Sequence, residues 1–178
     1  MPKEVAQAIG IIATVITILS FQQKKQRGIV LFQATSSAMW CIHFIMIGAY
    51  TGGILNLVAT LRNLIMTKRD KYKWTGSHWF VVLMAVLSLG VYIVSFTVFN
   101  TPTTKTNLLL ELLPALGIVV TTIAFREKEA KKVRLLSIMN SPLWLVYNAF
   151  NHSIGGVITE TFCLISIGIG YLRHDRKK

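Results

Sequence analysis

The sequence has few acidic residues, few cysteines and no linker long enough to divide it. Only 7 of its 178 residues are Asp or Glu, against 19 Lys and Arg. Charged residues make up 15% of the chain, which is below the roughly 25% of an average soluble protein. Cys41 and Cys163 lie inside apolar stretches, where we interpret them as small packing residues and not as a disulfide or a metal pair. Residues 1–178 are therefore expected to form a single domain.

The sequence also lacks the motifs that carry enzymatic chemistry. Its Cys and His residues are not spaced like zinc ligands, and it has no Gly-rich phosphate loop and no GxSxG motif. The carboxylate of Glu160 and the imidazole of His43 lie in different halves of the chain and make no recognisable catalytic set. We therefore predict that the protein is not an enzyme and uses neither a metal ion nor a cofactor.

Apolar residues dominate what is present. They make up 53% of the chain and give a mean hydropathy of +0.55, although the formal net charge is +12. This combination suits neither a soluble domain nor a disordered tail, but it suits a protein of the lipid bilayer. A transmembrane helix needs roughly 20 mostly apolar residues. The predicted spans are Val5–Phe21, Ile29–Tyr50, Gly52–Met66, Trp79–Phe99, Leu108–Phe125, Leu135–Phe150 and Ile154–Leu172.

The basic residues follow every second predicted span, and 16 of the 19 lie there. They are Lys24, Lys25, Arg27, Lys68, Arg69, Lys71, Lys73, Arg126, Lys128, Lys131, Lys132, Arg134, Arg173, Arg176, Lys177 and Lys178. By the positive-inside rule this side is cytoplasmic, so we expect the N-terminus outside and the C-terminus inside. The clusters are expected to contact anionic lipid headgroups. Because no soluble domain carries them, we do not interpret them as a nucleic-acid site.

The two halves of the chain match each other, without a gap, at an offset of 104 residues. The matched pairs include Thr17 and Thr121, Phe21 and Phe125, Lys24 and Lys128, Ser37 and Ser141, Trp40 and Trp144, Gly52 and Gly156, and Arg69 and Arg173. Apolar matches are common between membrane segments, so the Trp, Gly and basic pairs carry the argument. We predict one repeat over residues 5–70 and a second over residues 108–174, joined by a connector helix over residues 79–99.

A single connector span returns the chain to its starting side, so the two repeats are expected to run parallel. Parallel repeats about an axis along the membrane normal are a recurrent transporter design, with the binding site near the midplane between the halves. The predicted fold is an all-α integral membrane protein with seven transmembrane helices, arranged as two parallel three-helix repeats around one connector helix.

The spacing of Trp and polar residues resembles that of a known family. Trp40 is followed by Asn56 after sixteen positions, and Trp144 is followed by Tyr147 and, after sixteen positions, by Glu160. With the 3+1+3 arrangement, the chain from about residue 9 to 173 resembles the SWEET sugar transporters and their PQ-loop relatives. It departs from them where the family has a Pro-Gln pair, because SFQQKK and AFREKE stand there instead.

A closer resemblance is to the YgjV-type bacterial inner-membrane proteins, which carry HF followed by GAY or GTY, then ELLP with a nearby Gly, and later SIGG followed by Glu. The corresponding residues here are His43-Phe44, Gly48-Ala49-Tyr50, Glu111-Leu112-Leu113-Pro114 with Gly117, and Ser153-Ile154-Gly155-Gly156 with Glu160. This resemblance implies a bacterial inner membrane location but supplies no substrate.

Polar and aromatic residues form matching stripes on the second and sixth predicted spans, because positions i, i+4 and i+7 share a helical face. The stripes are Ser36, Trp40 and His43, and Asn140, Trp144 and Tyr147. Polar groups in hydrocarbon cost several kcal/mol unless they are satisfied, so both stripes should face protein or a cavity. We interpret them as solute-binding residues, with the Trp pair as a clamp for a ring-shaped solute. Interhelical packing with internal hydrogen bonds is the alternative.

Asn56 and Glu160 occupy equivalent positions of the repeats, about 6 to 9 Å below the outer end of their spans. An ionisable residue at such depth indicates function. Burial disfavours the charged form of a carboxyl group, so Glu160 is predicted to carry a proton between the outward-facing and inward-facing states. A structural hydrogen bond and a contact with a cationic part of the solute are the alternatives. Arg62 and Glu111 lie close to helix ends, where reaching the headgroups costs little, and the alternative for Glu111, near Pro114, is a place in the lining of the outer mouth.

The sequence predicts a transporter of a small polar solute that works by alternating access. Its solute-binding residues are Trp40, His43, Asn56, Asn140, Trp144, Tyr147 and Glu160. A non-transporting membrane receptor or scaffold is the alternative, because fold does not fix function. One chain holds both three-helix units, so we expect a monomer, with weak self-association as the alternative.

Overall fold

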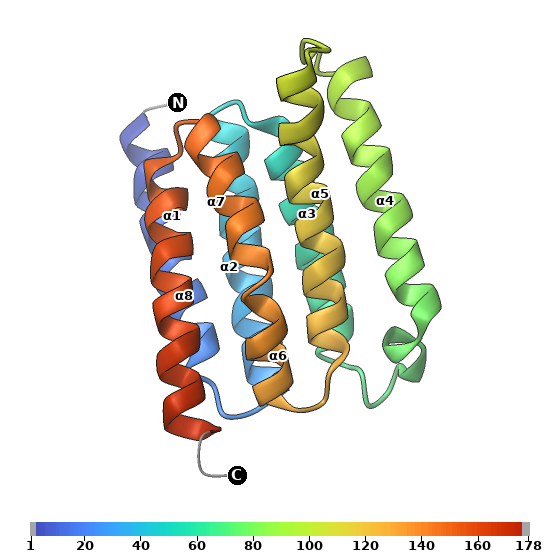
Figure 1. Cartoon of the computed structure of the whole chain (residues 1–178), viewed down its shortest axis with the longest axis vertical. Helices are drawn as coiled ribbons and strands as arrows, with labels where there is room; N and C mark the ends of the chain where they lie inside the picture. Colours follow the sequence, from blue (N-terminus) through green and yellow to red (C-terminus); the bar gives the residue numbers. More distant parts are fainter. Residues whose placement is uncertain (1–2, 176–178) are drawn as a thin grey trace.

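A computed structural model describes residues 3–175, which form helices joined by turns and contain no strand (Figure 1). The elements are α1 (Lys3–Phe21), α2 (Gln26–Met46), α3 (Tyr50–Met66), the 3-10 helix η1 (Lys73–Gly76), α4 (His78–Thr97), α5 (Lys105–Arg126), α6 (Ala130–Ser137), α7 (Asn140–Phe150) and α8 (Ile154–His174). Five of them, α1, α2, α4, α5 and α8, are long and apolar enough to cross a membrane. The all-α prediction is confirmed for these residues.

Hydroxyl side chains start three of the long helices. The side-chain oxygens of Ser77, Thr104 and Ser153, which precede α4, α5 and α8, each accept a hydrogen bond from the backbone N–H three residues later. Such caps satisfy one of the donors that the first helical turn leaves free and contribute about 1 kcal/mol each. They explain why these helices begin within three residues of the predicted span starts.

Two matching turns connect α2 to α3 and α7 to α8. Each holds one residue with a left-handed backbone, Gly48 at φ 82° and His152 at φ 52°, and the two positions are separated by the same 104 residues as the sequence match. In each turn the N–H of the following residue, Ala49 or Ser153, donates at 2.9 Å to the carbonyl five residues back. This is the Schellman pattern, which ends a helix and reverses the chain.

The turn at Gly48 makes the prediction for the second span, Ile29–Tyr50, wrong at its end. The structure ends α2 at Met46 and gives Tyr50 to α3. The apolar run through this segment conceals the reversal, because the residues of the turn are themselves mostly apolar.

The sixth predicted span, Leu135–Phe150, is not one helix. It is divided into α6 and α7 by a break at Ile138 and Met139 (Figure 1). Pro142 explains the position, because a proline has no N–H to donate to the carbonyl four residues earlier and its ring clashes with that carbonyl, here Ile138. The helix therefore stops before Ile138 and restarts at Asn140.

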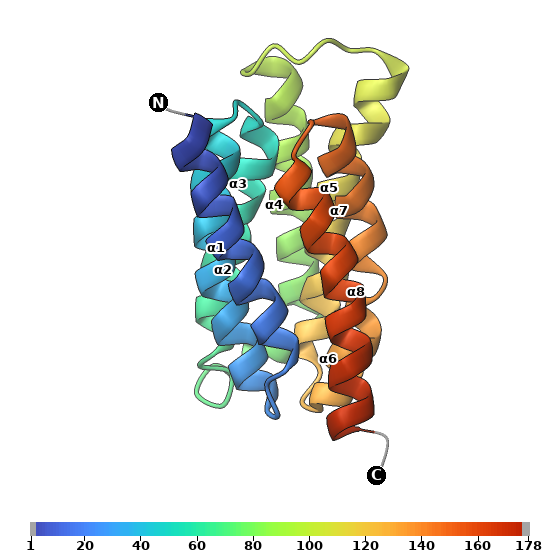
Figure 2. The same ribbon diagram turned by 90° about the vertical axis from the view of Figure 1, so that its left-hand side faces the viewer.

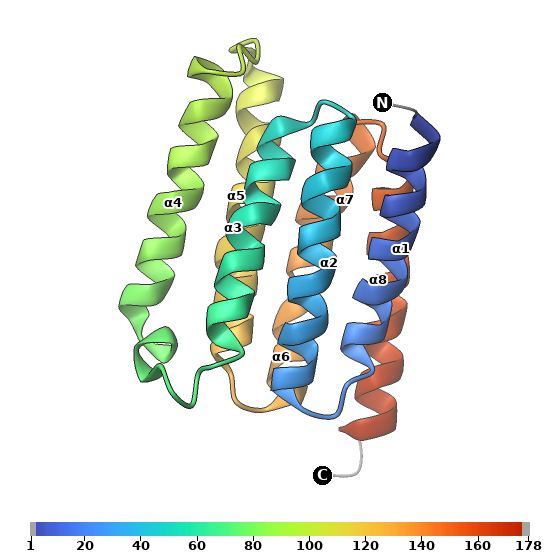
Figure 3. The same ribbon diagram turned by 180° about the vertical axis from the view of Figure 1, so that it is seen from behind.

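The helices pack in two layers with one helix at the edge (Figures 1 and 2). One layer holds α1, α2 and α3, with α2 in the middle, and faces the viewer in Figure 3. The other holds α8, then α6 and α7 in line, then α5. Across the layers α1 packs against α8 and α3 against α5, while α4 lies beside α5 and α3. The chain starts α1 and α8 at one end of the bundle and finishes α8 at the other (Figure 1).

The interior holds many polar residues beside its apolar core, and the surface holds many large apolar ones. Buried positions include Asn56, Arg62 and Arg134, together with many Ser and Thr, whereas large apolar residues such as Trp79 and Leu109 are 79% and 68% exposed. Contact between such a surface and water would be unfavourable, whereas contact with hydrocarbon is not. Polar side chains in a protein surrounded by hydrocarbon are favoured in its interior. The distribution supports a location inside the bilayer.

Candidate functional site

A cavity of about 80 Å³ lies between the two layers. Its walls come from α1, α2, α3, α5, α6, α7 and α8, and none of its lining residues belongs to α4. The polar lining residues are Thr17, Gln33, Ser36, Ser37, Asn56, Arg62, Thr121, Ser137, Asn140, Ser141, Asn148, Thr159 and Glu160. Such a concentration of polar groups in the middle of an otherwise apolar bundle is the feature expected of a solute site.

Five of the seven predicted solute-binding residues line this cavity: Trp40, Asn56, Asn140, Trp144 and Glu160. They come from both halves of the chain, which the structure brings together around one space. Their role in binding stays a prediction.

His43 and Tyr147 do not line the cavity and instead make structural contacts. His43 is fully buried, with Nδ1 2.9 Å from the carbonyl oxygen of Ala6 and Nε2 3.3 Å from Oγ of Ser153, so it ties α1 to the start of α8. The Tyr147 hydroxyl accepts a hydrogen bond of 3.1 Å from the N–H of Gly52. Both side chains lie one turn closer to the helix end than the Trp residues with which they share a face.

The two Trp residues are bridged by Phe44, which sequence reasoning did not include. The Phe44 ring centroid is 5.6 Å from that of Trp40 and 6.0 Å from that of Trp144. The space of the predicted clamp for a ring-shaped solute is therefore occupied by a side chain of the protein. Together with Tyr147, whose ring is 5.8 Å from Trp144, these rings close one end of the cavity.

The side chains that pack one helical turn before each Trp differ between the two halves. In the first half, Ser36 donates to the carbonyl of Ala13 at 3.0 Å and also contacts the Thr17 hydroxyl. In the second half the larger Asn140 stands at the Ser36 position and Gly117 at the Ala13 position. A Cβ atom on Gly117 would lie 2.6 Å from Nε1 of Trp144 and 2.8 Å from Oδ1 of Asn140, so the missing methyl group makes room for both the indole and the amide.

Arg62 is a functional candidate that the sequence interpretation assigned wrongly. It does not reach the headgroup region, because its side chain is only 3% exposed and lies in the cavity wall. Its Nη1 donates to the carbonyl of Ile118 at 2.8 Å and to the hydroxyls of Thr121 and Thr122 at 2.7 and 3.0 Å, and its guanidinium lies 5.2 Å from the Phe125 ring. The available signal was its position inside the apolar segment Gly52–Met66.

Glu160 lies across the same cavity, next to Ser141, and no ion pair joins it to Arg62 within residues 3–175. Its counterpart Asn56 is held by its own helix, donating from Nδ2 to the carbonyl of Gly52 at 2.8 Å. The two equivalent positions therefore hold different functional groups, an amide and a carboxyl group. The Asn56 amide already uses one of its donors in a hydrogen bond within its own helix. Glu111, the other acidic residue of the sequence argument, does not line the cavity.

Three polar atoms of the cavity walls are enclosed and have no hydrogen-bond partner among the described residues. They are Oγ of Ser137, Oδ1 of Asn140 and Oδ1 of Asn148. Buried polar atoms in proteins are nearly always paired, so unpaired ones at a cavity indicate a missing partner. No group of three or more His, Cys, Asp or Glu residues in the described part of the chain could hold a metal ion.

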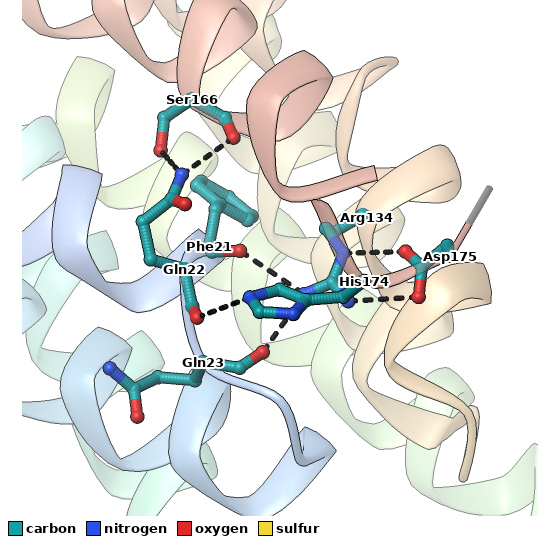
Figure 4. A network of polar contacts seen from close by, with 7 residues as sticks. All are labelled: Phe21, Gln22, Gln23, Arg134, Ser166, His174 and Asp175. Atoms are coloured by element: carbon teal, nitrogen blue, oxygen red, sulfur yellow. Dashed lines mark hydrogen bonds and ion pairs between the residues drawn. The ribbon is translucent and has the colours of Figure 1, made fainter. Parts of the chain in front are cut away.

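A buried ion pair closes the other end of the bundle (Figure 4). Arg134, which the sequence grouped with the exposed basic clusters, is 0% exposed, and its Nε and Nη2 donate to the Asp175 carboxylate at 2.8 and 3.1 Å. Its Nη1 donates to the carbonyls of Phe21 and Gln23 at 3.1 and 2.9 Å. One side chain of α6 thereby holds the end of α1 and the end of α8.

Gln22 strengthens the same junction. Its Nε2 donates to the carbonyl and hydroxyl oxygens of Ser166 at 2.9 and 2.8 Å, and its own carbonyl lies 3.1 Å from Nε2 of His174 (Figure 4). Arg134 of α6 therefore holds the carbonyls of Phe21 and Gln23. Ser166 and His174 of α8 contact Gln22 between them.

Comparison with known proteins gives one family and one curated relative. Residues 4–178 match the family model Imp-YgjV, described as bacterial inner membrane protein. The chain is 28% identical over 171 residues to the inner membrane protein YgjV of Escherichia coli strain K12, which covers 96% of this chain and 85% of that protein. No solved structure matches.

Proposed function

The chain belongs to the Imp-YgjV family of bacterial inner membrane proteins, and from that premise we propose that it transports a small polar solute across the inner membrane. The observation that carries the proposal is the polar cavity between the two layers, with matching residues of both halves in its walls. A scaffold has no need of such a space, because enclosing unpaired polar groups costs stability.

We propose that the fold acts as seven spans, with α6 and α7 forming one broken span and α4 serving as the connector between two three-helix units. The packing supports this, since α1 against α8 and α3 against α5 are equivalent interfaces if the units are related by a twofold axis along the bundle. The matching turns at Gly48 and His152 support it as well. Because both units are in one chain, a monomer is sufficient for transport.

Alternating access then requires that the two ends of the cavity open in turn. With the N-terminus outside, as the basic residues indicate, the ring cluster of Trp40, Phe44, Trp144 and Tyr147 forms the outer closure. The Arg134 network forms the inner closure. The break between α6 and α7 lies between these closures and provides a place where one unit can bend.

We further propose that Glu160 couples transport to protons. The carboxylate is deprotonated while it contacts the solute and takes up a proton when the site is empty, so solute and proton alternate on one group. The neutral amide of Asn56 at the equivalent position cannot do this, which makes the two units chemically unequal.

Uptake into proteoliposomes tests the proposal. Purified protein should exchange a labelled solute across the membrane with saturable kinetics, and liposomes without protein should not. Saturable binding with no flux would instead favour the alternative function of a membrane receptor.

A further inference from the structure

The cavity has two ionisable residues in its lining, and they are not paired with each other. Arg62 stands on α3 and Glu160 on α8, in different three-helix units, and no ion pair connects them within residues 3–175. A buried ionic group is stable only with a counter-charge or with hydrogen-bond partners. A solute with charges of both signs would supply a partner to each of these two groups.

The Arg62 side is built to receive an anion. Nε of Arg62 donates to Oδ1 of Asn63 at 3.0 Å and Nη1 donates to three oxygens of α5, so the guanidinium is fixed in place. Its Nη2 makes no hydrogen bond to any residue of 3–175, which leaves two N–H donors on a rigid cation. A carboxylate is the partner that guanidinium geometry favours.

The Glu160 side is built to receive a hydrogen-bond donor. Asn148 is 2% exposed, its Oδ1 has no partner, and its side chain packs on Gly156, one helical turn before Glu160 on the same face. Ser141, on the same helix as Asn148, is next to Glu160. An ammonium group has three N–H donors and no acceptor, which suits a carboxylate one helical turn from the unpaired Oδ1 of Asn148.

We infer that this cavity binds a small zwitterion, with its ammonium group at Glu160 and its carboxylate at Arg62. The inference rests on the proposed function in taking the cavity as the solute site, and it adds the substrate class. The volume of about 80 Å³ limits the size. At about 10–15 Å³ for each water-sized occupant, it holds roughly six heavy atoms, the size of alanine.

A set of analogues of one size tests the assignment on the native protein. Alanine carries both charges, lactate only the anion, alaninamide only the cation and lactamide neither. Calorimetric binding at pH 7 should show alanine bound at least about tenfold more tightly than each of the others, because each analogue leaves a charged group of the site without its counter-charge. Equal binding of lactate, alaninamide or lactamide, or no binding of any zwitterion among glycine, alanine, serine and β-alanine, would overturn the assignment.

Two variants with matched controls locate the charges. Glu160→Gln should reduce alanine binding to the level of lactate, and Arg62→Gln should reduce it to the level of alaninamide. Glu4→Gln and Arg27→Gln, which remove the same charges from exposed positions, should leave alanine binding unchanged. If Arg62→Gln does not fold, the analogue comparison on the native protein decides. Alanine binding without flux would refute transport but keep the substrate class, whereas flux of an uncharged sugar would keep transport and refute the class.

Discussion

Replacing Asp175 with Asn should destabilise the protein strongly, although Asp175 lies far along the sequence from the residues that it holds. The change keeps the size of the side chain and removes its charge, which leaves the Arg134 guanidinium 0% exposed and without its counter-ion. Removing one partner of a buried ion pair costs about 3–5 kcal/mol. Arg134 keeps two carbonyl partners, so we expect a loss near the lower limit, about 3 kcal/mol.

The measurement is thermal unfolding of purified protein in detergent. For a chain of this length about 3 kcal/mol corresponds to a fall in Tm of about 6–12 °C. Glu129→Gln provides the matched control, because it removes a carboxylate from the exposed Lys132 pair, whose atoms lie 3.3 Å apart. Exposed pairs contribute about 0–1 kcal/mol, so the control should change Tm by no more than about 4 °C.

A double variant separates the charge effect from packing. Arg134→Met together with Asp175→Asn removes both charges and keeps the volume of the arginine stem, so it should be more stable than Asp175→Asn alone. If Asp175→Asn melts within 1 °C of the Glu129→Gln control, or if the double variant is the least stable of the three, the reasoning from a buried ion pair is wrong.

Four further predictions concern the turns, the cavity and the orientation. His152→Gly should raise the free energy of unfolding by about 0.5–1 kcal/mol, because glycine adopts the left-handed conformation without strain, and a lower Tm would contradict this. Trp40→Phe and Trp144→Phe should each lower solute affinity roughly fivefold, about 1 kcal/mol. The loss in the free energy of unfolding, followed through Tm, should be smaller than this loss of binding free energy. The same change at the exposed Trp79 should alter neither affinity nor Tm. Glu160→Gln should still exchange solute at raised concentration but lose its response to a pH gradient in proteoliposomes, and accumulation driven by that gradient as in the native protein would refute proton coupling. A reporter active only in the cytoplasm should work when fused to the C-terminus and fail at the N-terminus, and the reverse result would overturn the topology.

Helix existence could be predicted from this sequence because the physical signal is local. Apolar runs and the basic residues after alternate spans are each properties of a few consecutive residues. The break at Ile138 and Met139 also has a local signal, Pro142, but an apolar run that continues across it conceals the break. The end of α2 was missed for the same reason, since Gly48 is the one residue of its turn that indicates a reversal.

The environment of single charges could not be predicted, because it depends on partners distant in the chain. Arg62 is buried by carbonyl and hydroxyl groups of α5, and Arg134 by the end of α1 and by Asp175. Helical periodicity placed His43 and Tyr147 on the correct faces, but a face does not give depth, and both lie beyond the end of the cavity. The match between the two halves does not give depth either, because His43 and Tyr147 are separated by the same 104 residues as Trp40 and Trp144.

The exchange of Ala13 and Ser36 for Gly117 and Asn140 makes the two halves unequal in the substitutions that they tolerate. A methyl group at position 117 would lie 2.6 Å from Nε1 of Trp144 and 2.8 Å from Oδ1 of Asn140. Return to Ala at 117 therefore requires movement of the Trp144 indole even if position 140 becomes Ser again. The first half carries Ala at the same place beside its own Trp, so duplicated halves with the same aromatic residue no longer accept the same residue at an equivalent position.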